Sequence, residues 1–210
     1  MRERFWMFGL ACMLLTGLLT ALIIPERYVM GMIEAERQSN YAFLGYETAR
    51  NTESRAERWF EGLFIRTGLM DASYRATTSD LGPANPASKL ETWLEKALEW
   101  AEGRVRVLWA AMFQLMVRIS IGIMWLPITA LILTPFVIDS LVSRKIKANS
   151  FAVTSPHLQA LGTRSIFWIA LGYALLQLLP LQLHPVWTPL FIGVVALSIW
   201  LSISQFAKRA

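Results

Sequence analysis

The residue types that most often perform catalysis or hold metals are scarce in this sequence. Its 210 residues include two histidines, His157 and His184, and one cysteine. Ser155 lies two residues before His157, but no acidic residue or second base accompanies the pair. The phosphate-loop motif and the HExxH, GxSxG and CxxC motifs are all absent. We therefore predict no catalytic, cofactor-binding or metal-binding residues, and a protein that is not an enzyme.

Arg118 interrupts the longest apolar stretch of the chain, residues 107–138. A cation in such a stretch marks either an ion pathway or a side chain that extends its charged end to the lipid headgroups. We favour the second interpretation. Apart from Arg118 and the thiol of Cys12, the apolar stretches contain no strongly ionisable side chain, and an ion-coupled transporter usually needs one.

The elements that must position these residues are predicted to be membrane helices. Hydrophobic residues make up 55% of the chain and charged residues 17%, and the mean hydropathy is +0.42. Four uncharged stretches exceed the roughly 18 residues that a helix needs to cross a bilayer; they are residues 5–24, 119–138, 165–183 and 188–206. The predicted fold class is all-α, a polytopic membrane protein with four transmembrane helices and an α-helical extracytoplasmic segment between the first and the second.

The short segments that carry basic residues all fall on one side of the membrane in a chain with four spans. The N-terminus, the connector after the second stretch and the C-terminal tail carry them, whereas the HPVW connector at residues 184–187 has none. The basic residues are Arg2, Arg4, Arg144, Lys145, Lys147, Arg164, Lys208 and Arg209. Since short Lys- and Arg-rich flanks stay in the cytoplasm, we predict a multi-pass protein of the bacterial inner membrane with both termini cytoplasmic.

This orientation divides the chain into five segments. They are the cytoplasmic N-terminus and first helix (1–24), an extracytoplasmic helical region (25–106), a long second helix entering the membrane (107–138), a basic cytoplasmic connector (139–164), and the third and fourth helices with a cytoplasmic tail (165–210). Residues 25–106 contain 11 basic and 13 acidic residues, a net charge of −2, although the whole chain carries +5. The positive charge thus belongs to the inner face, where we expect contact with membrane lipid and no direct contact with nucleic acid.

The region before the second apolar stretch has helical patterns. Ala56, Trp59, Phe60 and Leu63 share one face by their i, i+3, i+4, i+7 spacing. After a Gly- and Pro-containing break, apolar residues recur at alternating steps of four and three, which is typical of a coiled-coil seam. This seam comprises Leu94, Leu98, Ala101, Val105, Leu108, Met112, Leu115 and Ile119.

The seam continues into the membrane stretch, so we predict one helix from Lys89 to about Ile138, bent at Pro127 and Pro135. Its apolar part is too long for one bilayer at about 1.5 Å per residue. Part of it is therefore expected to pack against the outer helices or a partner.

The connector FVIDSLVSRKIKANSFAVTSP, residues 136–156, resembles a known family. It is similar to the small four-span membrane proteins of integrating conjugative elements and conjugative plasmids. The matching residues are Asp139, Leu141, Val142, Arg144, Lys145, Ile146, Ser155 and Pro156. Many relatives carry a glycine after the aspartate and a histidine nearer the third span, where this chain has Ser140 and Gly162-Thr163.

The resemblance implies a non-enzymatic accessory of the coupling ATPase, the motor that delivers relaxase-bound DNA to the type IV secretion channel. We thus expect an inner-membrane scaffold of conjugative DNA transfer in a complex with that ATPase. The residues expected to contact the partner or lipid are Arg144, Lys145, Lys147, Leu94, Leu98, Leu108, Met112 and Leu115. The alternative is a small oligomeric transporter or channel, for which the sequence offers few polar side chains in the membrane.

Overall fold

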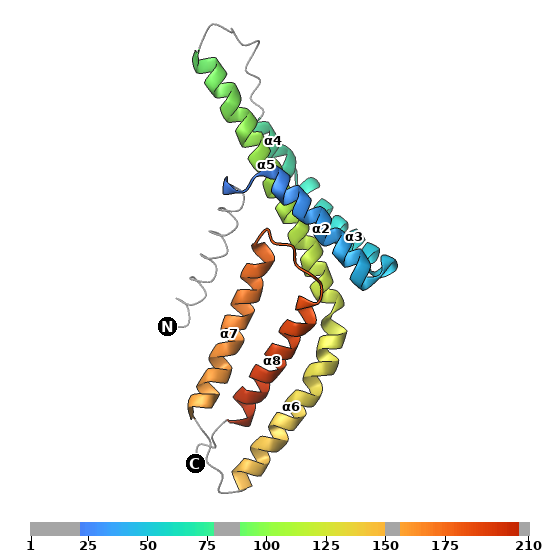
Figure 1. Ribbon diagram of the computed structural model, residues 1–210, viewed down its shortest axis with the longest axis vertical. Helices are drawn as coiled ribbons and strands as arrows, with labels where there is room; N and C mark the ends of the chain where they lie inside the picture. The colour runs from blue at the N-terminus through green and yellow to red at the C-terminus, as the bar shows by residue number, and fades with distance from the viewer. Residues whose placement is uncertain (1–21, 78–88, 150–155, 206–210) are drawn as a thin grey trace. The chain divides into compact units, whose positions relative to one another are not determined.

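The computed structural model describes residues 22–77, 89–149 and 156–205, and all regular structure in these ranges is helical (Figure 1). The elements are α2 (Glu26–Leu44), α3 (Tyr46–Phe60), the π-helical turn η1 (Glu61–Ile65), α4 (Leu69–Thr77), α5 (Lys89–Met124), α6 (Leu126–Asn149), α7 (Pro156–Leu178) and α8 (Trp187–Ser204). The predicted all-α class is confirmed. The first predicted span, residues 5–24, lies outside the described ranges except for its last three residues.

Four helices in the described ranges are long and apolar enough to cross a membrane, which indicates a membrane protein. The segments are Lys96–Met124 of α5, Leu126–Lys147 of α6, Ala160–Leu178 of α7 and Trp187–Ser204 of α8. A larger share of the α5 segment is buried inside the protein than of the other three. Much of the apolar surface of α5 is therefore covered by its own chain.

The predicted single helix from Lys89 to Ile138 is two helices in the structure. α5 ends at Met124, Trp125 forms a turn in which its N–H donates to the carbonyl of Gly122 at 3.2 Å, and α6 begins at Leu126. Pro127 explains the break, because proline has no N–H to continue the α5 ladder but is well tolerated in the first turn of a new helix. α6 then continues through Pro135, past the predicted end of the helix, to Asn149.

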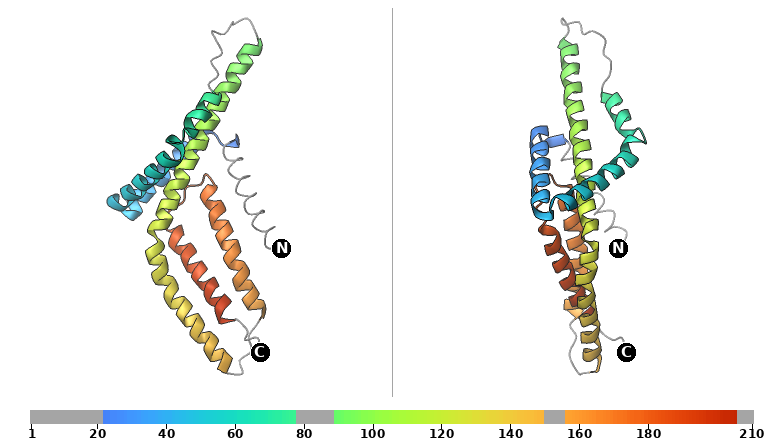
Figure 2. Two further views of the ribbon diagram at one scale, coloured as in Figure 1. Left: turned by 180° about the vertical axis from the view of Figure 1, so that it is seen from behind. Right: turned by 90° about the vertical axis from the view of Figure 1, so that its right-hand side faces the viewer.

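The chain forms two compact units. The first lies within Met1–Ile121 and includes Leu178–Gln182, and the second consists of Gly122–Gln177 and Leu183–Ala210. In the first unit, α2 and α3 are joined at Gly45, whose φ of 79° lies in the left-handed region that favours glycine. Figure 2 shows α5 as a continuous helix with α2, α3 and α4 beside it.

The core of the first unit forms where α3 packs on α5. Ala49, Thr52, Ala56 and Phe60 recur at helical spacing on α3 and are buried. The Phe60 ring lies edge-on to those of Trp109 and Phe113 on α5, at centroid distances of 6.0 and 5.6 Å. The hydroxyl of Ser120 donates to the carbonyl of Thr52 at 2.8 Å, and the indole N–H of Trp109 donates to Ser73 Oγ of α4 at 2.9 Å.

The π-helical turn η1 changes which residues face this core. The predicted face included Leu63, but Leu63 is 52% exposed. In η1 the N–H of Arg66 donates to the carbonyl of Glu61, five residues back, at 2.9 Å. Such a turn adds one residue to the helix and rotates the residues after it about the helix axis. Phe64 consequently replaces Leu63 on the inner face, with its ring 5.3 Å from Phe60 and 5.2 Å from Trp109.

The second unit is built on the packing of α6 against α8. α7 meets α8 at Gly162, where a Cβ atom would lie 2.7 Å from the backbone nitrogen of Ser202 and 2.9 Å from its Cα. The Thr163 and Ser202 hydroxyls share a hydrogen bond of 2.9 Å beside this crossing. A small residue at such a crossing lets two membrane helices approach closely.

We expect Gly162→Ala to lower the thermal unfolding temperature of the detergent-purified protein, followed by tryptophan fluorescence. The added methyl group would overlap the Ser202 backbone, so α7 would have to move away from α8. Gly172→Ala on the same helix is the matched control, because its Cβ would meet nothing within 4 Å. Equal unfolding temperatures for the two variants would show that the crossing does not limit stability.

Candidate functional site: the basic end of α6 and the Arg118 cluster

Side chains on the last turns of α6 form hydrogen bonds with α8. These turns carry residues of the predicted connector. The indole N–H of Trp200 donates to Asp139 Oδ2 at 2.6 Å. Lys147 Nζ donates to the carbonyl of Ser204, the final residue of α8, at 3.3 Å. Ser140 is fully buried, and its hydroxyl donates to the carbonyl of Val137. Ser140 is therefore part of the packed interior, while the exposed Asp139 and the half-buried Lys147 bind α8 through their side chains.

The side chains between them face outward. Leu141, Val142 and Ile146 are exposed apolar residues, and Arg144 and Lys145 are exposed cations on the same turns. We call these five residues the basic end of α6. Of the three predicted contact cations, Arg144 and Lys145 thus lie on the surface, whereas Lys147 is half-buried and serves the packing against α8.

The first unit contains a buried ion pair that the sequence did not indicate. The Arg118 Nε and Nη2 atoms donate to the two carboxylate oxygens of Glu36 at 2.9 and 2.6 Å. The side chains are 4% and 2% exposed. Arg118 also donates to the carbonyls of Leu179 and Leu181 at 3.0 and 2.7 Å, in the connector between α7 and α8. We call these four residues the Arg118 cluster.

The Arg118 cluster corrects the expectation that Arg118 extends to the lipid headgroups. A buried guanidinium is tolerated only when a counter-charge and hydrogen-bond acceptors replace its water, and the planar fork of arginine matches a carboxylate in two parallel bonds. Met32 contributes a further, weaker contact, with its sulfur 3.8 Å from Nη2. The arginine therefore joins α2, α5 and the connector after α7 within the first unit.

The described residues of the predicted seam on α5 are less buried than the residues on another face of the same helix. Val107, Gln114, Val117 and Ile121 are buried. Met112 and Leu115 each precede a buried residue by two positions, which is about 200° around a helix of 3.6 residues per turn. Leu108 is 39% exposed, while Leu98, Met112 and Leu115 are half-buried, and the Leu94 side chain is outside the described part of the chain.

The remaining sequence candidates for chemistry, the two histidines, belong to the second unit. His157 is an exposed residue in the first turn of α7. His184 Nδ1 accepts a hydrogen bond from the backbone N–H of Val186 at 3.2 Å, in the turn that leads to α8. The structure brings neither histidine into the Arg118 cluster or the basic end of α6.

Both regions fall within a match to a known family. Residues 25–207 match a family described as IncC plasmid conjugative DNA transfer protein DtrJ-like. The chain belongs to the DtrJ-like family. This membership assigns it to conjugative DNA transfer, in agreement with the association with conjugative elements that the connector predicted. No curated protein and no solved structure matches the chain.

The DtrJ-like match includes every described helix and most of the connectors. It includes Glu36 and Arg118 of the first unit and the whole of α6 in the second. The sequence signal that could have revealed the Arg118 cluster is the single arginine inside an apolar stretch, which requires an acidic partner when it is buried. Nothing in the local sequence distinguishes Glu36 from the other glutamates of residues 25–106, because α2 presents acidic residues on several faces.

Proposed function

We propose that this DtrJ-like chain is a non-enzymatic inner-membrane scaffold of conjugative DNA transfer that associates with the coupling ATPase of type IV secretion. The observation that carries this proposal is the basic end of α6. Two cations and three apolar side chains are exposed there, while Asp139 and Lys147 hold the same helix against α8. A surface that combines basic and apolar side chains on a fixed helix fits a protein partner.

The charges also fit the inner leaflet of the membrane. A basic residue near anionic headgroups contributes about 1 kcal/mol of attraction. In this proposal Arg144 and Lys145 lie at the cytoplasmic surface, where they are accessible both to headgroups and to a cytoplasmic motor domain. The alternative of a transporter or channel receives little support from the Arg118 cluster, because its guanidinium is already bound by a carboxylate and two carbonyls.

The direct test is purification of the tagged chain from donor cells in mild detergent, with mass spectrometry of the proteins that accompany it. We expect the coupling ATPase to be enriched over a tagged, unrelated four-span membrane protein produced at the same level. Recovery of the chain alone under several mild detergents would contradict the proposed association. It would leave membership of the conjugation family unaffected.

The proposed orientation predicts opposite labelling of two engineered cysteines in a Cys12→Ser background. We expect Arg58→Cys on α3 to react with a membrane-impermeant maleimide in intact cells, because residues 25–106 are proposed to lie outside the cytoplasm. Lys145→Cys should react only after the inner membrane is permeabilised. Both positions are exposed, so a lack of labelling reports the side of the membrane and not burial. The reverse pattern would invert the orientation.

A further inference from the structure

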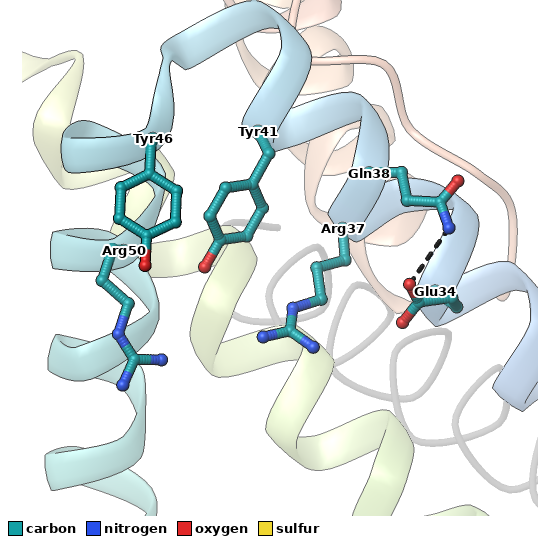
Figure 3. Close-up of a pocket in the computed structure, with 6 residues that line it drawn as sticks. All are labelled: Glu34, Arg37, Gln38, Tyr41, Tyr46 and Arg50. Atoms are coloured by element: carbon teal, nitrogen blue, oxygen red, sulfur yellow. Dashed lines mark hydrogen bonds between the residues drawn. The ribbon is translucent and has the colours of Figure 1, made fainter.

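A polar cleft between α2 and α3 shares no lining residue with either region described above. It has a volume of about 310 Å³ and is lined by Glu34, Arg37, Gln38, Tyr41, Tyr46 and Arg50. Figure 3 shows that the first four come from α2 and that Tyr46 and Arg50 come from the first turns of α3. The whole cleft belongs to the first unit.

One wall of the cleft is held in place by Glu53. Arg37 Nε lies 2.7 Å from Glu53 Oε1, and the Tyr41 hydroxyl donates to Glu53 Oε2 at 2.7 Å. The hydrogen bonds of the Arg37 side chain with Glu53 and then with Tyr41 raise the pKa of Arg37, so the guanidinium stays charged. Glu34 accepts a hydrogen bond from the Gln38 amide at 3.1 Å, drawn as a dashed line in Figure 3.

Arg50 differs from Arg37 in its contacts. Its Nη1 atom lies 3.8 Å from Glu53 and 4.0 Å from Glu57, which is longer than a hydrogen bond. Among the described residues, Arg50 therefore has charge partners but no short carboxylate hydrogen bond, and its forked N–H donors are available at the edge of the cleft. A carboxylate is the group that this fork binds in two parallel bonds.

The tyrosines supply the apolar part of the cleft. Tyr46 is 68% exposed, and its ring centroid lies 5.6 Å from that of Tyr41 at an interplanar angle of 48°. The two rings are tilted relative to each other, and both line the cleft. Tyrosine and arginine side by side are also the residue types that contribute most to protein–protein binding.

From these contacts we infer that the cleft between α2 and α3 binds an acidic polypeptide segment, with Arg50 binding a carboxylate and Tyr46 packing against an adjacent side chain. Arg37 and Tyr41 act as positioning residues, since Glu53 fixes both of them. The site is distinct from the basic end of α6 and lies in the other unit. Its occupant is therefore a second contact of the chain, whatever the basic end of α6 binds.

The test is calorimetric titration of the full chain in mild detergent with two blocked peptides. One has the sequence Gly-Phe-Glu-Asp-Gly, and the other is its neutral counterpart Gly-Phe-Gln-Asn-Gly. We expect the acidic peptide to bind with a Kd of about 1 mM or tighter at low salt, and the neutral peptide to bind at least about tenfold more weakly, as the loss of a charge-assisted pair predicts.

Arg50→Gln should weaken binding of the acidic peptide by about tenfold or more and leave the neutral peptide unchanged. Arg58→Gln is the matched control, because Arg58 is an exposed arginine of the same helix that does not line the cleft. Equal binding of the two peptides, equal effects of the two substitutions, or no binding at all would overturn the inference. So would tighter binding of a cell-wall disaccharide whose carboxylates are amidated, which would assign the cleft to a glycan.

Discussion

Replacing Arg118 with methionine is expected to lower the free energy of unfolding of the first unit by about 3–5 kcal/mol, the usual consequence of removing one partner of a buried ion pair. Methionine fills much of the same volume, but it leaves the Glu36 carboxylate buried without its counter-charge and removes the donor from the carbonyls of Leu179 and Leu181. Urea titration of the detergent-purified protein, followed by circular dichroism, measures the change.

The double variant Arg118→Met, Glu36→Met separates the pair from the packing around it. It should recover part of the loss, because two apolar side chains in place of a buried pair leave no unpaired charge. Arg66→Met is the surface control. Its pair with Glu61 is 3.1 Å long, but the side chains are 73% and 51% exposed, so a several-fold smaller effect is expected. Equal losses for Arg118→Met and Arg66→Met would contradict a structural role for the Arg118 cluster.

The second large effect is expected in DNA transfer. Replacing Arg144 and Lys145 together with glutamine should lower mating frequency and recovery of the coupling ATPase by about tenfold or more. The two charges together contribute about 2 kcal/mol of attraction, and each 1.4 kcal/mol corresponds to a factor of ten. The protein should remain in the membrane in its original orientation, because its apolar helices and the other basic flanks are unchanged.

Lys147→Gln is the internal comparison for this experiment. Lys147 bonds the end of α8, so its replacement should lower thermal stability more than it lowers ATPase recovery. The double replacement of Arg144 and Lys145 should lower ATPase recovery more than it lowers thermal stability. If mating frequency and ATPase recovery stay unchanged for Arg144→Gln, Lys145→Gln at matched protein levels, the basic residues act only as a topology signal, and the proposed partner surface is wrong.

The sequence predicted the helical class because apolar stretches and helical spacing are local properties. The predicted segment 188–206 agrees with α8 to within two residues at both ends, whereas α7 runs from Pro156 to Leu178 and so begins and ends earlier than the predicted segment 165–183. The prediction of one helix is wrong at Pro127, because this proline lies in the first turn of a new helix and does not bend a continuing one. The prediction of the buried face of α3 is correct as far as Phe60 and wrong at Leu63, because nothing in the local sequence signals the extra residue of η1.

The candidate sites also differ in whether they depend on local sequence or on contacts between distant residues. The motif around Arg144 and Lys145 is continuous in sequence, so its place on one helix could be predicted. The hydrogen bond from Lys147 to Ser204 could not, because Ser204 lies on α8, 57 residues later. The arginine inside an apolar stretch signals a buried partner, but the identity of that partner could not be predicted, because Arg118 and Glu36 are distant in sequence and no local pattern pairs them. The cleft between α2 and α3 depends on the turn at Gly45 and on Glu53, which a single helix pattern does not connect.

The Arg118 cluster also sets an order of events during biosynthesis. Glu36 is translated 82 residues before Arg118, whereas Leu179 and Leu181 come after it by 61 and 63 residues. A nascent chain that has just exposed Arg118 can pair with Glu36 at once, but it has to wait for the whole of α7 before its last acceptors arrive. The first unit therefore matures in two stages. The second stage requires that α7 has been synthesised, whereas α8 follows both carbonyls in the sequence and is not needed for it.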